Sequence, residues 1–250
     1  MEAKPLKTVP KISARIWRPV INAFDRKIEA ACLRRDAYLN KVLEVELDWL
    51  DEEVSIPNSR ASYNYVLGQL DQLDRKLVSL ALSPELTTRL NEICNRKRIV
   101  RDAFFNRLFL LLGASPGTID TLFFGALGSE WRTGVWSENK HDGPFFQNGL
   151  YPLEPAIDPF WGIRSGLDMY TENEGLEVYT ESTTDKKIWV KRDARGEVMP
   201  LESVYTIVFE QQVRNSDNSL RGLNCYMPDW RISNQDAEKE PRIELDELIA

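Results

Sequence analysis

The sequence predicts an α+β chain of two domains, in which a mostly helical first half with a two-stranded ribbon precedes a β-rich second half. Three observations lead to this prediction: an internal repeat in the first half, a reversal of charge between the halves, and a change of composition near residue 119. We expect a first domain over residues 1–113, a β-rich acidic domain over 119–233, and an acidic tail over 234–250.

The repeat is clearest at "RDAYLNKVL", which begins at Arg35 and is matched 66 residues later by "RDAFFNRLF", which begins at Arg101. Four of the nine positions are identical, and the other five exchange similar residues. The segments that precede these two stretches can also be aligned without gaps. In both, apolar residues first alternate and then recur at helical spacing. We therefore expect two structural repeats, over about 10–53 and 76–112, each made of one strand and two helices.

The second repeat begins with the alternating stretch "KLVSLALS" (76–83), a predicted strand. A helix follows, with Ser83 as N-cap and Pro84 in its first turn. The basic stretch "NRKR" (95–98) interrupts the helical pattern, and a second helix is predicted from about Val100 to Leu112, with Gly113 as its C-cap.

The first repeat has the same order of elements. Its strand is "KISARIW" (11–17), a helix begins near Pro19, "CLRR" (32–35) interrupts it, and a longer helix is predicted over 36–53. Between the repeats, apolar residues at helical spacing predict a connecting helix within about 59–75.

This order, a strand and two helices with a basic break, resembles the ribbon-helix-helix DNA-binding unit, present here in tandem. The residues that carry the resemblance are "SARIW…RRDAYLNKVL" and "SLALSPELTTRLNEI…RKRIVRDAFFNRLF". The resemblance implies that the two strands pair antiparallel, that the helices interlock as an intramolecular pseudo-dimer, and that the ribbon enters the major groove of double-stranded DNA.

The resemblance also implies two sets of site residues. Outward side chains of the ribbon would face the bases, with Arg15 as the strongest reader of guanine: Lys11, Ser13, Arg15, Ser79, Ala81 and Ser83. The starts of the second helices would hold phosphates with the help of nearby cations: Arg34, Arg35, Arg96, Lys97, Arg98 and Arg101.

Plainer interpretations accompany each set. Basic residues at helix ends are commonly solvated surface, and Asp36 and Asp102 can serve as helix-start residues that complement the dipole. Trp17 packs either outward or against the first helix. Because the two strands carry unlike residues, we expect an asymmetric or weakly specific DNA site.

Charge separates the two halves. Residues 1–112 hold 19 Lys and Arg against 15 Asp and Glu, which leaves 32 − 19 = 13 basic and 39 − 15 = 24 acidic residues in the remainder. A basic first half and an acidic second half suggest two domains with different partners, divided near "GASPGT" (113–118).

Four stretches of the second half are predicted strands, with a hairpin turn at "DARGE" (193–197): "GLEVYTES" (175–182), "KKIWVKR" (186–192), "SVYTIVFEQQV" (203–213) and "LRGLNCYM" (220–227). Residues 136–169, rich in Pro and Gly, are a predicted loop around the sheet. The tail over 234–250 is predicted to be disordered or to dock a partner, with a short helix at its end.

The sequence has no motif for a nucleophile, a nucleotide phosphate, a dinucleotide or zinc, so we expect no catalytic residue, cofactor or metal. The single histidine, His141, lies beside Asp142 and near Glu138 in a predicted loop, where a surface position is the default. An alternative hydrolase would use carboxylates among Glu172, Glu174, Glu177 and Glu181. The aromatic residues of this half are expected to form core: Trp131, Trp136, Phe145, Phe146, Phe160 and Trp161.

Cys32, Cys94 and Cys225 are far apart, which favours buried, reduced thiols and a cytoplasmic location. We see no apolar leader segment and no apolar run long enough to span a bilayer, so we expect no membrane partner.

Together these features predict a transcriptional regulator, a repressor or an antitoxin-like protein, that reads DNA and binds a partner protein or an effector through its second half. Several copies could associate on DNA. The alternatives are an architectural subunit of a conjugation or mobile-element complex, an enzyme targeted to DNA with its site in the second half, and an interaction protein that never meets DNA.

Overall fold

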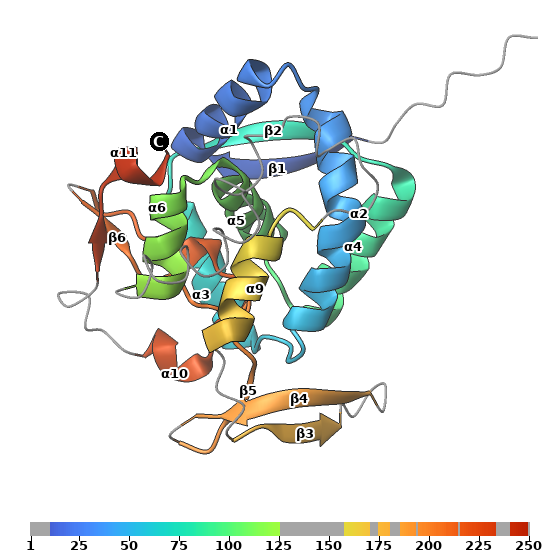
Figure 1. Cartoon of the computed structure of the whole chain (residues 1–250), viewed down its shortest axis with the longest axis vertical. Helices are drawn as coiled ribbons and strands as arrows, with labels where there is room; N and C mark the ends of the chain where they lie inside the picture. The colour runs from blue at the N-terminus through green and yellow to red at the C-terminus, as the bar shows by residue number, and fades with distance from the viewer. Residues whose placement is uncertain are drawn as a thin grey trace, which may run out of the picture.

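The computed structural model describes residues 11–125, 158–170, 175–180, 186–193, 195–214, 216–233 and 241–249. Over these residues the fold is mixed α+β, with helices dominant and three small sheets. In Figure 1 the two-stranded sheet β1–β2 lies towards one end of the molecule and the sheet β3–β4–β5 lies at the opposite end.

The elements expected in the first half are present. The first repeat contains β1 (Lys11–Trp17), α1 (Arg18–Ala30) and α2 (Arg35–Glu53). The second contains β2 (Arg75–Ala81), α4 (Pro84–Lys97) and α5 (Arg101–Gly113), and α3 (Arg60–Asp71) connects the two.

β1 and β2 pair antiparallel, with Ser13 opposite Ser79 in the third of seven residue pairs. These two serines are 66 residues apart, as are the repeats, so the pair lies on a pseudo-two-fold axis. The inward residues Ala14, Ile16, Val78 and Leu80 are buried. Trp17 is also buried, which settles its packing in favour of the core.

The turn between the helices has the same conformation in both repeats. Cys32 and Arg98, again 66 residues apart, adopt a left-handed backbone with φ of 55° and 50°. The next amide donates across the turn in each case, from Leu33 to the Ile28 carbonyl (3.0 Å) and from Ile99 to the Cys94 carbonyl (2.9 Å). This six-to-one bond is the pattern that ends a helix in a Schellman motif.

Two predicted helix ends can be compared with the structure. The Ser83 hydroxyl accepts from the amide of Leu86 (3.2 Å), which confirms Ser83 as the N-cap of α4. Gly113 is the last helical residue of α5 and not its cap, since the cap position is Ala114. The Gly113 carbonyl accepts from Lys27 Nζ, so a side chain from the other repeat satisfies the helix end.

The second half begins with α6 (Pro116–Ile119) and a π-helical turn (Asp120–Phe124), and α9 (Trp161–Tyr170) follows later in the chain. Its remaining described elements are β3 (Glu177–Thr180), β4 (Lys187–Arg192), β5 (Val198–Pro200), β6 (Gln212–Val213), η5 (Leu220–Leu223), α10 (Asp229–Ile232), β7 (Arg242–Ile243) and α11 (Leu245–Leu248). β4 pairs antiparallel with β3 and β5, whereas β6 and β7 pair in parallel.

The predicted strands of the second half are right in two places and wrong in two. β3, β4 and the hairpin turn after β4 are present, with Gly196 at φ 81° and the Asp193 amide donating to the Glu197 carbonyl (3.0 Å). Residues 203–213 form turns and irregular chain, with only β6 at their end, and residues 220–227 begin with a 3₁₀ turn. Their apolar side chains, such as Val204 and Phe209, are buried in the common hydrophobic core without forming one face of a strand.

Two further expectations are corrected. The loop predicted over 136–169 is helical from Trp161 onward, and its residues 136–157 lie outside the described chain. The tail predicted to be disordered is ordered over 241–249, where β7 pairs with β6 and both Ile243 and Leu248 are buried. The predicted short helix at its end is present as α11, and residues 234–240 are outside the described part.

One hydrophobic core joins the described residues of both halves, from Ala14 in β1 to Leu248 in α11. At its centre lies α5, whose residues from Ala103 to Gly113 are all buried. The predicted boundary near 113–118 therefore does not separate two hydrophobic cores. Among the described helices, none is long and apolar enough to cross a membrane.

Candidate nucleic-acid interface

The outward face of the β1–β2 ribbon is exposed and basic. Lys11, Ser13 and Arg15 on β1 and Ser79 on β2 are exposed, and Ala81 is half-buried. Both strands are described in full, and their sequences "KISARIW" and "RKLVSLA" contain four cationic residues and no Asp or Glu. Ser83 lies beyond the end of β2, where its hydroxyl caps α4, so it is not part of the ribbon.

Leu77, which is 67% exposed, also lies on this face and was not predicted from the sequence. The alternation through Leu77, Ser79 and Ala81 could have identified it, but an apolar residue was assigned no role on this face. In the register, Arg15 lies opposite Leu77 and Lys11 opposite Ala81. The exposed cations of this face, Lys11 and Arg15, therefore come from β1, whereas β2 contributes the apolar residues and the half-buried Arg75 at its start.

A pair of asparagines fastens the ribbon. Asn106 in α5 donates from Nδ2 to the Arg15 carbonyl (3.0 Å) and accepts at Oδ1 from the Trp17 amide (2.7 Å). Asn40 in α2 does the same for β2, with Nδ2 donating to the Ala81 carbonyl (2.9 Å) and Oδ1 accepting from the Ser83 amide (2.8 Å). Each helix thus holds the strand of the other repeat.

Two arginines repeat this exchange. Arg35 donates from a terminal nitrogen to the Ser79 carbonyl (3.2 Å), and Arg101 donates to the Ser13 carbonyl (3.0 Å). Arginine and asparagine are two of the four residue types identical between "RDAYLNKVL" and "RDAFFNRLF". The identity of the repeat is therefore explained in large part by the side chains that hold the opposite strand.

The N-termini of α2 and α5, where phosphates are predicted, lack side-chain caps. The N-cap residues are Arg34 and Val100, and neither side chain accepts a hydrogen bond from the first turn. Unsatisfied amides and the helix dipole favour an anion at such a position. Asp36 and Asp102 lie in the first turns and complement the same dipoles, as in the plainer interpretation.

The surroundings of these two N-termini differ in charge. Around α5 the second repeat places Asn91, Asn95 and Arg98, where the first repeat has Asp25, Glu29 and Cys32. Arg101 contacts the neutral Asn91 (3.5 Å), whereas Arg35 forms an ion pair with Asp25 (3.2 Å). An anion is therefore favoured at α5 and disfavoured at α2.

The N-terminus of α5 also borders a pocket of about 600 Å³. Its wall includes three arginines, Arg60, Arg98 and Arg101, together with Asn64, Asn91 and Asn95. Asp102 is the acidic residue of this wall. The pocket offers amide and guanidinium donors of the kind that hold a phosphate.

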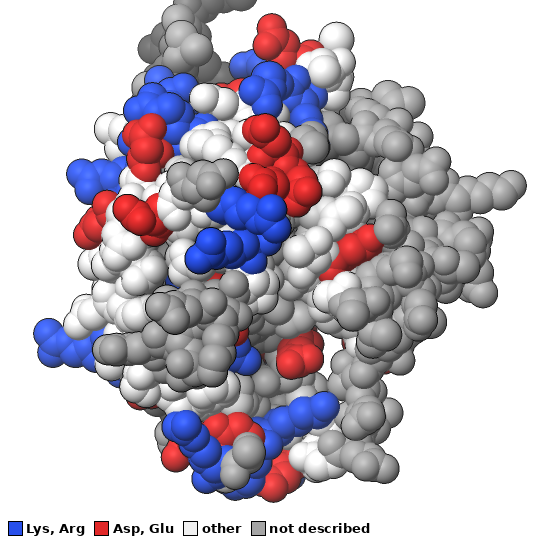
Figure 2. Space-filling view, turned by 90° about the vertical axis from the view of Figure 1, so that its left-hand side faces the viewer, with Lys and Arg blue, Asp and Glu red and all other residues white. Residues whose placement is uncertain are grey.

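The remaining predicted clamp residues are placed unequally. Arg34 is exposed, but Arg96 forms an ion pair with Asp51 (2.7 Å), and Lys97 is buried with its Nζ 3.7 Å from the same carboxylate. On the face drawn in Figure 2, basic and acidic side chains of the described residues lie interleaved.

Most of the residues considered for catalysis lie outside the described part of the chain. His141, Asp142 and Glu138 lie outside the described residues, as do Glu172, Glu174 and Glu181. Glu177 forms an exposed ion pair with Arg192 (2.9 Å). Of the aromatic residues expected in the core, Phe160 is buried, Trp161 is 44% exposed, and Trp131, Trp136, Phe145 and Phe146 are outside the described part.

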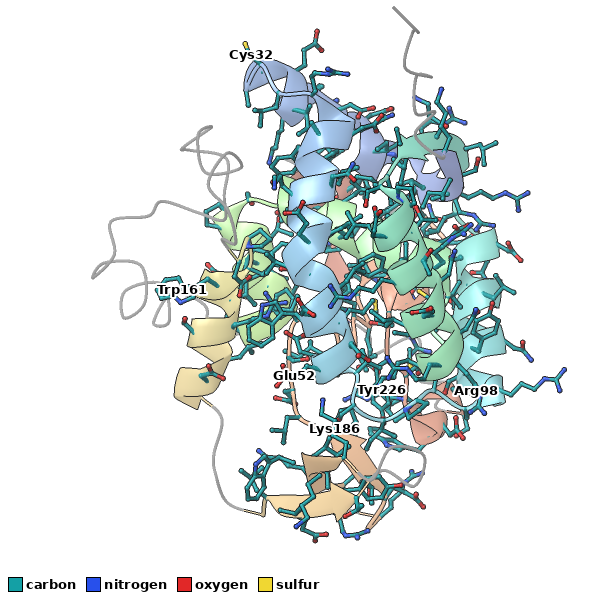
Figure 3. All side chains as sticks on the ribbon, turned by 90° about the vertical axis from the view of Figure 1, so that its right-hand side faces the viewer. Cys32, Glu52, Arg98, Trp161, Lys186 and Tyr226 are labelled. Carbon is teal, nitrogen blue, oxygen red and sulfur yellow. The ribbon has the colours of Figure 1, made fainter. Side chains whose placement is uncertain are left out.

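The three cysteines are free thiols. Burial raises the pKa of Cys94 and of Cys225 to about 12, so both are protonated and unreactive. Cys32 is exposed in the turn at one end of the molecule, which corrects the expectation that all three are buried (Figure 3). Within the described residues, no group of three His, Cys, Asp or Glu could hold a metal ion.

A buried ionic cluster that joins the two halves was not predicted from the sequence. Arg164 in α9 binds both carboxylate oxygens of Glu46 (3.0 and 3.2 Å) and one oxygen of Glu53 (2.6 Å), and it also pairs with Asp158. The Tyr205 hydroxyl donates to Glu46 (2.6 Å). Burial raises the pKa of Glu46 to about 7, although the positive charge of Arg164 acts in the opposite direction. The carboxylate is fully buried and hydrogen-bonded on both oxygens, so the cluster anchors α9 to α2.

No family model matches the sequence, and no curated protein or solved structure was found to resemble the chain.

Proposed function

We propose that the chain is a regulator that binds double-stranded DNA, in which the two repeats act as a tandem ribbon-helix-helix unit and the β1–β2 ribbon enters the major groove. The observation that carries the proposal is the outward face of the ribbon, which is exposed, basic and free of carboxylates over both described strands. A two-stranded antiparallel ribbon fits the major groove in width, and polar side chains on its outer face can read base edges.

Rigidity of the ribbon supports the same function. Asn40, Asn106, Arg35 and Arg101 bond the strand backbones from the sides and leave the outward side chains free. A preorganised face loses less conformational entropy on binding. The fastening therefore presents the side chains of the ribbon in one geometry.

The two half-sites would be read differently. Arg15 is suited to the two acceptors on the edge of guanine, and Leu77 opposite it is suited to a thymine methyl group. The phosphate contact would be made chiefly at α5, because the first repeat puts Asp25 and Glu29 beside α2. We therefore expect a non-palindromic DNA site, with stronger phosphate contacts in the half-site next to α5.

Fluorescence anisotropy of the full chain on labelled duplex tests the proposal. The probes are a duplex from upstream of its own gene and a shuffled duplex of equal composition, each over a salt series. Arg15→Ala should weaken binding to the native duplex about 5- to 150-fold, the effect of losing one bidentate base contact. Arg192→Ala removes the same charge from β4 at the opposite end of the molecule (Figure 1) and should have little effect.

An architectural role on DNA is the second candidate function. It is favoured by the small side chains Ser13, Ser79 and Ala81, which offer little base discrimination. Equal, strongly salt-dependent binding to both duplexes would support it. No binding to either duplex at low salt would refute both proposals and leave the repeat as a protein-interaction scaffold.

A further inference from the structure

A second pocket, of about 490 Å³, lies where three segments of the chain meet. Its walls come from residues 57–59 ahead of α3, residues 195–199 of the β4–β5 hairpin, and residues 226–230. Figure 3 shows Tyr226 between the helical body and the β3–β4–β5 sheet. This pocket is separate from the ribbon and lies in the half of the molecule nearer that sheet.

Tyr226 is an unusual feature of this pocket. The residue is only 6% exposed, and its hydroxyl forms no hydrogen bond with a described residue, yet the oxygen is not one of the enclosed unpaired atoms and so keeps contact with solvent. The pocket therefore presents a hydroxyl group that is open to a ligand on its solvent side.

The electrostatic environment of the hydroxyl is negative. Burial, together with the smaller effect of the nearby carboxylates of Asp229 and Asp193, raises the pKa of Tyr226 to about 12. Asp229 and Glu197 are part of the wall, against one cation, Arg195. Asp229 accepts from the Ser59 and Ser62 hydroxyls through Oδ1, and its Oδ2 has no partner among the described residues.

The rest of the wall is suited to an apolar or aromatic body. Met199, Met227 and Trp230 contribute polarizable side chains. The guanidinium groups of Arg231 and Arg195 lie 4.8 and 5.5 Å from the centre of the Trp230 ring, so the chain itself already places cations against this aromatic surface.

We infer that this pocket binds a small organic cation, a protonated amine or amidine that carries an aromatic ring. The cationic group would lie beside Asp229 and Glu197 and donate a hydrogen bond to the Tyr226 hydroxyl oxygen. Its ring would lie between Met199, Met227 and Trp230. The structure gives such a ligand a regulatory path as well, and that second part rests on the proposed DNA-binding function.

The path runs through the buried side chain of Asn58. Its Nδ2 donates to the carbonyls of Cys225 (2.8 Å) and Arg98 (3.1 Å), and its Oδ1 accepts from the Met227 amide (2.9 Å). Arg98 in turn donates to the Asn58 carbonyl (3.0 Å). Arg98 forms the turn ahead of α5, so one side chain links the pocket wall to the favoured phosphate site.

Isothermal titration calorimetry on the full chain tests the ligand site without DNA. Benzamidine is the probe, neutral benzamide is its uncharged analogue, and benzoate is its anionic one. Benzamidine should bind at one site at least tenfold more tightly than benzamide, and benzoate should not bind. Equal binding of benzamidine and benzamide, or binding of neither, would overturn the inference.

Two variants locate the site. Tyr226→Phe keeps the ring and removes the hydroxyl, and it should weaken benzamidine binding several-fold with an unchanged far-ultraviolet spectrum. Tyr179→Phe makes the same change on the exposed strand β3, outside the pocket wall, and should have no effect. Identical affinities for both variants and the native chain would place the ligand elsewhere.

Amide hydrogen exchange tests the path independently of DNA. Saturating benzamidine should slow exchange several-fold at Arg98, Ile99 and the first turn of α5, and Tyr226→Phe should abolish the effect. Anisotropy then shows whether benzamidine shifts DNA affinity. Unchanged exchange would refute the path, whereas absence of DNA binding would refute the proposed function and leave the calorimetric result standing.

Discussion

Replacing Asn106 with alanine should destabilise the protein more than any exposed substitution, because this side chain makes three hydrogen bonds inside the core. Nδ2 donates to the carbonyls of Arg15 (3.0 Å) and Asp102 (2.7 Å), and Oδ1 accepts from the amide of Trp17 (2.7 Å). Asn106 and Trp17 are both almost fully buried, so water cannot replace the lost partners. At about 1 kcal/mol for each bond, the free energy of unfolding should fall by about 3 kcal/mol.

The matched control is Asn40→Ala, which removes the three equivalent bonds at the other end of the ribbon. Asn40 is half-buried, so solvent can satisfy part of what is lost, and we expect a loss of about half the size. Urea unfolding followed by circular dichroism measures both. For a chain of this size, the melting temperature of Asn106→Ala should fall by about 6–12 °C. A loss below about 1 kcal/mol for Asn106→Ala, or equal losses for the two variants, would refute the reasoning.

Three other predictions follow from buried groups. Arg107 is fully buried and donates to the carbonyls of Val204 (2.7 Å) and Ile207 (2.9 Å), so Arg107→Met should lower the free energy of unfolding in urea by about 3 kcal/mol. Lys41 is exposed at the equivalent position of the first repeat, and Lys41→Met should lower it by less than about 0.5 kcal/mol. Similar losses for the two variants would contradict this prediction. Burial raises the folded pKa of Glu46 to about 7 from an ordinary value of 4.5, so its contribution to stability is present below about pH 4.5 and is lost as the pH rises through 7. Over this range the unfolding free energy of the native chain should fall, relative to that of Glu46→Gln, by on the order of 3 kcal/mol. Parallel pH profiles of the two proteins would refute this prediction. A Cβ on Gly222 would lie 2.9 Å from the Leu70 amide nitrogen, so Gly222→Ala should lower the free energy of unfolding by about 1–3 kcal/mol and the melting temperature by several degrees. An unchanged melting temperature would show that η5 does not pack closely on α3.

The elements of the first half could be predicted because local chemistry and long-range packing agree there. Val78, Leu80 and the residues after Pro84 change from a period of two to helical spacing at the boundary between strand and helix. Ser83 and Pro84 mark the helix start, and the structure has a helix there. The repeat added a second copy of each signal, with which the noisier first copy could be aligned.

The second half was harder to predict because its apolar residues follow no single period. Val204, Tyr205 and Phe209 look like a strand when taken alone, yet all three are buried, with Tyr205 beside Phe104 and the Phe209 ring beneath the Arg107 guanidinium. Arg107 satisfies the carbonyls of this irregular segment in place of a neighbouring strand. Such a partner, about 100 residues away in sequence, is invisible to a local pattern.

The repeat, the strands and helices of the first half, and the candidate ribbon residues could be read from the amino-acid sequence, because these depend on side-chain periodicity and local capping. The contacts in the folded chain were needed to show that Arg35, Arg101 and the two asparagines hold the strand of the opposite repeat. They were also needed to show that Leu77 lies on the outward face and that Asp25 opposes an anion at α2. The same contacts show that the acidic half shares the core of the basic half. The physical reason is that hydrogen bonding, burial and Coulomb interactions act through space, so residues distant in sequence determine what each side chain can bind.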